Sequence, residues 1–281
     1  MIAILCGLGA AACWAGTMLT GTRASRSIGP TATLAWVMLT GLVIVGPVAL
    51  AQGVPEGLDW TSATWLAIAG AGNVAGLLLV YAGVRIGKVG VVAPITSTEG
   101  AVAAVIAVLT GEELGAWNGL ALGIVVVGVV LSSRPASEPE VERGDPRAAL
   151  FGITAACAFG ASLYATGRAS ADLTIAWAVL PPRLLGVVFV TIPLLAVRRL
   201  RLTREAAPFV VASGIAEVVG FVSYAVGARH GIAVTAVLAS QFAALAALAA
   251  RFLWGERIGR TATVGMVVIA VGVALVSLLR V

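Results

Sequence analysis

The chain has 281 residues, of which 60% are hydrophobic and only 11% are charged. A water-soluble domain carries about 25% charged residues, so composition and a mean hydropathy of +1.04 place most of this chain in lipid. The net charge of +5 comes from residues scattered over short loops, which argues against a nucleic-acid partner. Three unpaired Cys in apolar runs and a single His without ligand spacing predict no disulfide framework and no metal site.

Runs of about 20 apolar residues, the length that crosses a bilayer, follow one another along the chain. The first resembles a signal peptide but lacks a basic start, and an equivalent segment recurs in mid-chain, so it is predicted to be a retained helix. We therefore predict an all-α integral membrane protein with ten transmembrane helices at 2–22, 31–51, 62–83, 88–110, 115–133, 148–168, 174–197, 206–227, 231–253 and 258–280.

The two halves of the chain resemble each other. Gly7, Ala10, Ala11, Arg23, Ala24 and Ser25 match Gly152, Ala155, Ala156, Arg168, Ala169 and Ser170 at an offset of 145 residues. Gly83-x-Arg85-x-Gly87 matches Gly227-x-Arg229-x-Gly231, and Gly111-Glu112 matches Gly255-Glu256, both at an offset of 144. The sequence thus predicts a first five-helix repeat at 1–133, a polar linker at 134–147 and a second repeat at 148–281.

An odd number of helices in each half requires the second copy to be inverted in the membrane. If the N-terminus lies outside, 14 of the 18 basic residues lie on the cytoplasmic side and three lie outside (Arg168, Arg229 and Arg280). The remaining one lies in the middle of a span. Such an excess of Lys and Arg marks the cytoplasmic side. Both termini are therefore predicted outside the cytoplasm, in a multi-pass protein of the cell membrane.

Five polar residues lie ten to twelve residues into their predicted spans, and so at one depth: Asn73, Glu99, Arg183, Glu217 and Gln241. A charge at that depth costs at least ~2.5–3.5 kcal/mol if it faces lipid. We expect these residues to line one midplane cavity that binds a small-molecule substrate, as in transporters with inverted repeats. Asn73 and Glu217 are equivalent in the two repeats, which predicts that they face each other across it.

Each residue also has a structural interpretation. Arg183 is either part of the site or an ion-pair partner that holds Glu99 or Glu217. Glu99 and Glu217 are candidates for a coupling proton, the only cofactor expected. Asn73 and Gln241 either contact substrate or form interhelical hydrogen bonds.

Aromatic and small residues complete the prediction. Trp14 and its repeat mate Phe159, with Tyr164, line the cavity or pack the core. The pairs Gly72-x-x-x-Gly76 and Gly119-x-x-x-Gly123 predict close helix packing, whereas the fifth and tenth helices have no midplane polar residue and are predicted to be peripheral.

Two five-helix copies, each with Gly-Glu closing its fourth helix, resemble the EamA-type transporters of the drug/metabolite transporter superfamily. The segments that carry the resemblance are Ala101 to Gly115 and Leu245 to Gly259, with Pro182-Arg183-Leu184-Leu185 in the seventh helix. Two positions depart from the family: Val37-Met38-Leu39-Thr40-Gly41 lacks an Arg, and Ser240-Gln241-Phe242 lacks a Pro. The resemblance implies secondary active export or uptake of a small metabolite, amino acid-like or drug-like, through a cavity formed by helices 1, 3, 4, 6, 8 and 9.

Two other functions remain as alternatives. An intramembrane enzyme needs a nucleophile–base pair or metal ligands within the bundle, and no span carries such a set. A non-transporting accessory subunit would use its interior charges for structure alone. The choice between monomer and homodimer stays open.

Overall fold

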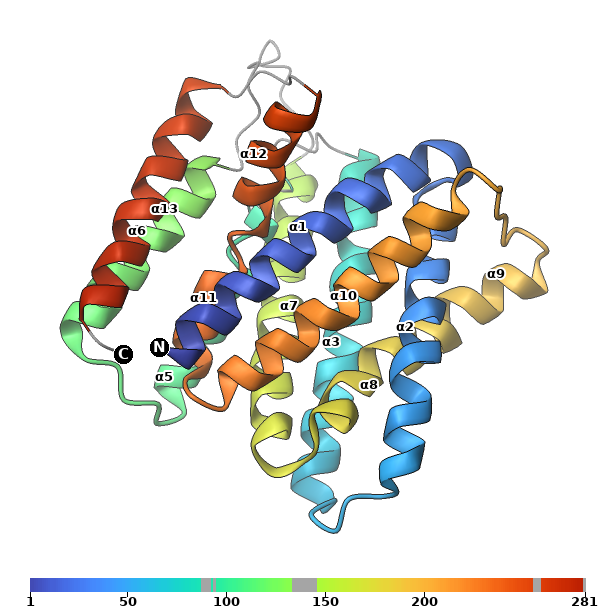
Figure 1. Cartoon of the computed structure of the whole chain (residues 1–281), viewed down its shortest axis with the longest axis horizontal. Coiled ribbons are helices and arrows are strands. Elements are labelled where there is room, and N and C mark those ends of the chain that lie inside the picture. The colour runs from blue at the N-terminus through green and yellow to red at the C-terminus, as the bar shows by residue number, and fades with distance from the viewer. Residues whose placement is uncertain (87–91, 93–94, 133–145, 255–258, 280–281) are drawn as a thin grey trace.

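A computed structural model describes residues 1–86, 92, 95–132, 146–254 and 259–279, and all regular structure in these ranges is helical. The predicted linker 134–147 lies almost wholly outside the described residues, as do Lys88, Pro94 and Glu256. The helices are α1 (Ile2–Ile28), α2 (Pro30–Gln52), α3 (Trp60–Ile86), α5 (Glu99–Leu109), α6 (Ala116–Ser132), α7 (Pro146–Asp172), α8 (Ile175–Gly186), η1 (Val187–Thr191), α9 (Ile192–Ala196), α10 (Ala207–Ala228), α11 (Ile232–Ala239), α12 (Phe242–Trp254) and α13 (Arg260–Leu278) (Figure 1).

Eight helical stretches among the described residues are long and apolar enough to cross a membrane, where α8 to α9 (Ile175–Ala196) and α11 to α12 (Ile232–Leu253) each count as one stretch. α5 and α6 are shorter apolar helices. Several helices extend past the predicted spans. The first was expected to end at residue 22 but continues to Ile28, where Gly29 with φ +83° precedes Pro30. Hydropathy predicts where the chain leaves the lipid, not where the helix ends. The polar segment after Thr22 contains no helix breaker before the Gly-Pro pair, so the helix continues to it.

The fourth and ninth predicted spans are not continuous helices. Turns at Ser97–Thr98 and at Ser240–Gln241 separate α5 and α12 from the helical residues before them. At these turns Thr98 and Ser240 donate side-chain hydrogen bonds to the carbonyls of Ile95 and Val237, at 2.7 and 2.8 Å. Hydroxyl side chains that bond to the backbone compete with helix formation, which a hydropathy pattern does not reveal. The turns fall at equivalent places in the two halves.

The seventh predicted span is helical from Ile175 to Ala196 and contains a π-helical turn in its second half. Pro181 and Pro182 lie inside α8, and η1 is a π-helix that leads into α9, whose second residue is Pro193. A proline ring inside a helix clashes with the carbonyl four residues earlier. The π turn before Pro193 widens the helix at that carbonyl.

Helix contacts between the two halves occur in pairs: a helix of one half packs on a helix of the other, and the equivalent helices make the same contact with the halves interchanged. α3 packs along α7, and α1 packs along α10 in the same way (Figure 1). A Cβ on Gly76 would lie 2.7 Å from the ring of Phe159, and one on Gly220 would lie 2.6 Å from the ring of Trp14. Because Gly76 and Gly220, and Trp14 and Phe159, are sequence equivalents, the duplication extends to the packing. Gly72 and Gly76 make the close approach to α7 that their spacing predicts.

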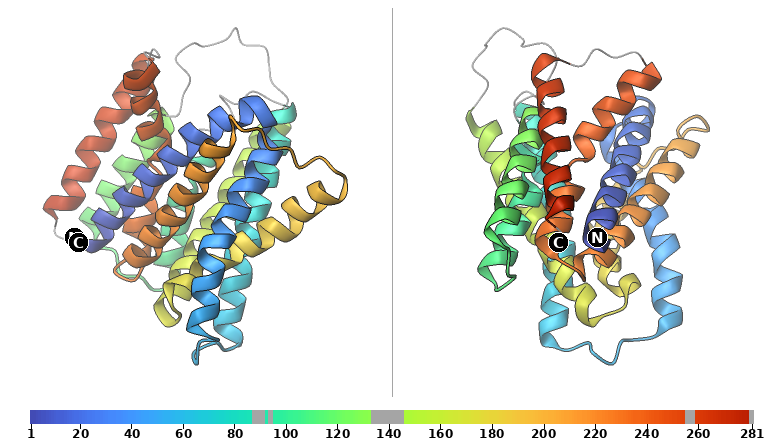
Figure 2. Two further views of the ribbon diagram at one scale, coloured as in Figure 1. Left: turned by 45° about the vertical axis from the view of Figure 1, so that its right-hand side comes forward. Right: turned by 60° about the vertical axis from the view of Figure 1, so that its left-hand side comes forward.

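Helices α6 and α13 pack against each other at one side of the molecule, as the peripheral prediction expects (Figures 1 and 2). The contact does not use the predicted pair Gly119 and Gly123: a Cβ on Gly123 would meet nothing within 4 Å. Gly128 lies instead against Ile269, and its equivalent Gly272 lies against Val125. The spacing identified a suitable motif but not the face turned toward the partner helix. The start of α1 and the end of α13 lie at the same end of the molecule (Figure 2).

Candidate functional site

A cavity of about 490 Å³ lies between the two halves. Its described wall comes from the six helical segments implied by the family resemblance, α1, α3, α5, α7, α10 and α12, and also from α2. Thr22 and Pro30, both exposed, mark its open end near the α1–α2 connection. Such a cavity has the size of a small-molecule site.

The opposite end is closed by packed side chains, which we call the closed-end cluster: Ala103, Ala107, Leu163, Tyr164, Tyr224, Ala225 and Ala228. Polar contacts reinforce that end. The Glu112 carboxylate accepts hydrogen bonds from the backbone N–H groups of Ile232 and Ala233 at 3.1 Å and so caps α11. The Arg229 guanidinium donates to the carbonyls of Ser170 and Leu173 at the end of α7. Among the described residues, packed side chains therefore close this end of the cavity.

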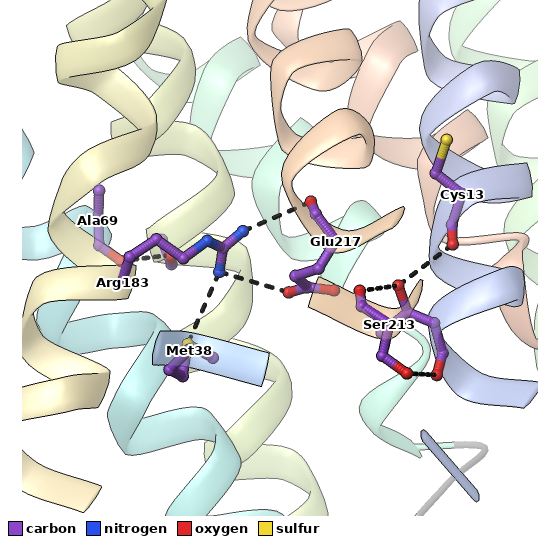
Figure 3. A network of polar contacts seen from close by, with 8 residues as sticks. Cys13, Met38, Ala69, Arg183, Ser213 and Glu217 are labelled. Atoms are coloured by element: carbon purple, nitrogen blue, oxygen red, sulfur yellow. Dashed lines mark hydrogen bonds and ion pairs between the residues drawn. The ribbon is translucent and has the colours of Figure 1, made fainter. Parts of the chain in front are cut away.

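Arg183 and Glu217 form an ion pair beside the cavity, with Nη1 and Oε1 3.5 Å apart (Figure 3). The Arg183 side chain is 0% exposed, and its guanidinium lies 4.6 Å from the centroid of Phe221. Its Nη2 donates to the carbonyl of Glu217 at 3.4 Å, and its Nη1 faces the sulfur of Met38 at 3.8 Å. Gly41 makes room for the Arg183 stem, because a Cβ there would lie 2.7 Å from Arg183 Cδ. Arg183 thus lies behind the wall and Glu217 on it.

Glu99 is on the wall and has a different environment. Its residue is 8% exposed, and within the described part of the chain its carboxyl has no hydrogen-bond partner. Glu99 is the first residue of α5, directly after the turn at Ser97–Thr98. The break that starts α5 therefore also fixes the position of this carboxyl on the wall.

Asn73 and Gln241 differ in their position relative to the cavity. Both are buried, at 7% and 3% exposure, and each has one side-chain atom without a hydrogen-bond partner among the described residues, Oδ1 of Asn73 and Nε2 of Gln241. Asn73 lines the cavity, but Gln241 does not. The predicted hydrogen bonds between helices are missing for these two atoms.

The two aromatic residues predicted for the site, Trp14 and Tyr164, also differ in their position relative to the cavity. Trp14 lines the cavity and packs against Phe221 and Phe242, at centroid distances of 5.1 and 6.3 Å. Tyr164 lies in the closed-end cluster, where its hydroxyl donates to Thr110 at 2.8 Å and Trp65 contacts its ring. Of the seven predicted site residues, the structure brings Trp14, Asn73, Glu99 and Glu217 to the wall.

The wall also contains residues that were not singled out from the sequence. α2 contributes Val37 and Met38, and the fourth and sixth segments contribute Thr96 and Ser162. Met38 had a usable signal, because it is the equivalent of Arg183 at an offset of 145. Ser162 donates to the carbonyl of Ala69 at 2.6 Å and had no such signal.

Asp59 lies outside the membrane-spanning segments and caps the start of α3, where it accepts a hydrogen bond from the N–H of Ser62 at 2.7 Å. Hydrogen bonds from the backbone and side chain of Ser62 hold the pKa of the Asp59 carboxyl below its ordinary value of 3.8. Within the described residues, no group of three His, Cys, Asp or Glu side chains is arranged to hold a metal ion.

Comparison with known proteins identifies the fold and the family. The model of the EamA-like transporter family matches residues 1–134 and 146–278. A solved structure named only "Crystal structure of protein" has a TM-score of 0.80 at 17% identity, over 99% of this chain and 96% of its own, and thus shows the same fold. The comparison with curated proteins finds no match. The family match spans both halves, so this membrane protein belongs to the EamA-like transporter family, within the drug/metabolite transporter superfamily.

Proposed function

We propose that the chain is a secondary active transporter that carries a small metabolite by alternating access. The observation that supports this is the position of the cavity: it lies between halves that make equivalent helix contacts, and packed side chains of the described residues close the end away from Thr22. Two halves that pack equivalently can reach a second state in which the other end opens. Such a state would release the substrate on the other side of the membrane.

The topology proposed for this mechanism has ten crossings in two inverted repeats. Eight crossings follow from the long apolar helices, and α5 and α6 would contribute to the other two. With both termini outside the cytoplasm of a cell-membrane protein, the open end near Thr22 faces the cytoplasm. The described conformation is then the inward-open one.

Cysteine labelling tests alternating access without a known substrate. In a background in which Cys6, Cys13 and Cys157 are replaced by Ala, one variant carries Thr22→Cys at the open end and another Ala107→Cys in the closed-end cluster. Both are treated in oriented membrane vesicles with a maleimide that does not cross membranes. We expect Thr22→Cys to react from the cytoplasmic face only and Ala107→Cys to react slowly from the external face.

If Ala107→Cys stays unlabelled from outside while Thr22→Cys reacts fully from inside, the cavity does not alternate and the proposal is wrong. Leu109→Cys, at an exposed position on the same helix, controls for access of the reagent to α5.

Proton coupling is the second part of the proposal. Glu99 and Glu217 are the carboxyl groups on the described wall. In proteoliposomes with a pH gradient, Glu99→Gln and Glu217→Gln should each remove the dependence of uptake or exchange on that gradient. Glu205→Gln, at an exposed position before α10, is the control that should keep it. If Glu217→Gln leaves pH-driven exchange unchanged, Glu217 is not a coupling group.

A further inference from the structure

We propose that the cavity binds a monovalent organic cation with an apolar body, and that Glu99 neutralises its charge in exchange for a proton. The inference rests on the proposed function of the cavity as a substrate site and names the chemical class of that substrate. It depends on the charge balance of the wall, on the environment of Glu99 and on the aromatic side chains around them.

The first argument is the charge balance of the wall. Among the lining residues that the structure describes, Glu99 and Glu217 carry carboxyl groups and none is Lys, Arg or His. Glu217 is already paired with Arg183, and that guanidinium is 0% exposed. Among the described lining residues an anionic ligand would therefore find no accessible cation, whereas a cationic ligand would find one unpaired carboxyl.

The second argument is the cost of leaving Glu99 ionised and alone. The residue is 8% exposed, and the described structure offers its carboxyl no hydrogen-bond donor from another side chain. An ionised carboxylate in such surroundings requires a positive partner. Either a proton on the carboxyl or an organic cation beside it supplies that charge.

Binding then becomes an exchange. The ligand arrives with one positive charge, the O–H bond of protonated Glu99 breaks, and its proton leaves to solvent while the carboxylate pairs with the cation. The net charge of the site is the same before and after. No other reactant is needed.

The third argument is the lining around the carboxyl. Trp14, Phe159, Phe221 and Phe242 present rings to the cavity, and Met18 and Met38 add flexible apolar surface. The face of an aromatic ring attracts cations, most strongly where water is excluded. Phe221 already makes such a contact with the Arg183 guanidinium. These walls suit an aromatic or alkyl body that carries an ammonium group.

Calorimetry on the purified full chain tests this with three probes of similar size: benzyltrimethylammonium, benzyl alcohol and benzenesulfonate. The quaternary cation has no proton of its own, so any proton released comes from the protein. We expect the cation to bind with release of about one proton, measured from the heats in two buffers. The neutral and anionic probes should bind at least tenfold more weakly.

Two variants assign the group. Glu99→Gln should lower the affinity for the cation at least tenfold and abolish proton release. The matched control Glu205→Gln, an exposed carboxyl outside the cavity, should keep both. Equal binding of benzenesulfonate and the cation, or unchanged cation affinity in Glu99→Gln, overturns the inference.

A flux measurement separates this inference from the transport proposal. Liposomes containing the chain are tested for uptake of the same cation. Binding with proton release but without flux keeps the ligand class and overturns transport. Flux of another solute class, with no binding of the cation, overturns the ligand class and keeps transport.

Discussion

Gly220 of the second half lies against Trp14 of the first, just as its equivalent Gly76 of the first half lies against Phe159 of the second, but the polar residues near these contacts differ. The second half holds Arg183 and Glu217 as an ion pair beside the cavity. Their equivalents in the first half are the neutral Met38 and Asn73. The two halves therefore share their helix packing and differ in charge.

This difference suggests a division of roles. Contacts that are equivalent in the two halves allow two arrangements of similar packing energy, which an alternating mechanism requires. Residues that are not equivalent give the cavity a definite charge and so its selectivity. The predictions below test one or the other kind of residue.

The largest effect is expected from Arg183→Met, which gives the second half the residue of the first. Removal of one partner from a buried ion pair costs about 3–5 kcal/mol, because the remaining charge is uncompensated. We expect a large loss in the midpoint of thermal unfolding in detergent. The double variant Arg183→Met/Glu217→Gln should recover most of that loss, since no unpaired charge remains, but it should not recover transport. Equal stability of the single and double variants would contradict the ion-pair interpretation.

The equivalent contacts are tested by Gly76→Ala and Gly220→Ala. Each added methyl would lie within 2.7 Å of an aromatic ring, so the helices must separate. Such overpacking costs about 1–3 kcal/mol, and equivalence requires similar losses in the two variants, measured by chemical or thermal unfolding. Gly123→Ala, where a methyl meets nothing within 4 Å, is the control and should not destabilise. A loss in only one of the two variants would contradict the shared packing.

Asn73 and Gln241 form a matched pair for the cavity itself. Both have an unpartnered buried atom among the described residues, but only Asn73 lines the wall. Because Oδ1 of Asn73 and Nε2 of Gln241 have no partner among the described residues, neither Asn73→Ala nor Gln241→Ala should remove an intramolecular hydrogen bond made by these atoms. A hydrogen bond from substrate to Asn73 is worth about 1 kcal/mol, so Asn73→Ala should weaken substrate affinity several-fold, whereas Gln241→Ala should leave it unchanged. The reverse order of the two affinities would place the binding site elsewhere.

The sequence predicted much of this arrangement because hydropathy and the repeat carry long-range information. The apolar helices and the peripheral position of α6 and α13 followed from apolar runs and from a repeat at an offset of 144 or 145 residues. The pairing of Arg183 with Glu217 was one of the alternatives that the sequence offered. The sequence did not predict which way a side chain faces: Tyr164 and Gln241 share the region of the site but point away from its cavity. Nor did it predict the helix breaks that place Glu99 at the start of α5, because those turns depend on local hydroxyl–backbone hydrogen bonds.

The smallest effect on stability is expected outside the membrane-spanning segments, where the two halves again make an equivalent hydrogen bond with side chains of different charge. Asp59 accepts a hydrogen bond from the N–H of Ser62 at 2.7 Å, and its equivalent Thr203 accepts one from the N–H of Ala206 at 3.2 Å. The pKa of Asp59 is lowered on folding by these hydrogen bonds, so its contribution to stability is present above its ordinary value of 3.8 and is lost as the pH falls through its folded value.

Thermal unfolding between pH 6 and pH 3 checks this last contrast between the halves. Asp59→Asn keeps a cap acceptor without the charge, so the stability gap between the wild type and Asp59→Asn should close as the pH falls below 3.8. Thr203→Ala should lower stability by about 0.5 kcal/mol at every pH, since the hydroxyl that accepts this hydrogen bond in the turn before α10 does not titrate. A gap for Asp59→Asn that stays constant with pH would show that Asp59 and Thr203 act alike, and that the charge difference between the halves is confined to the cavity.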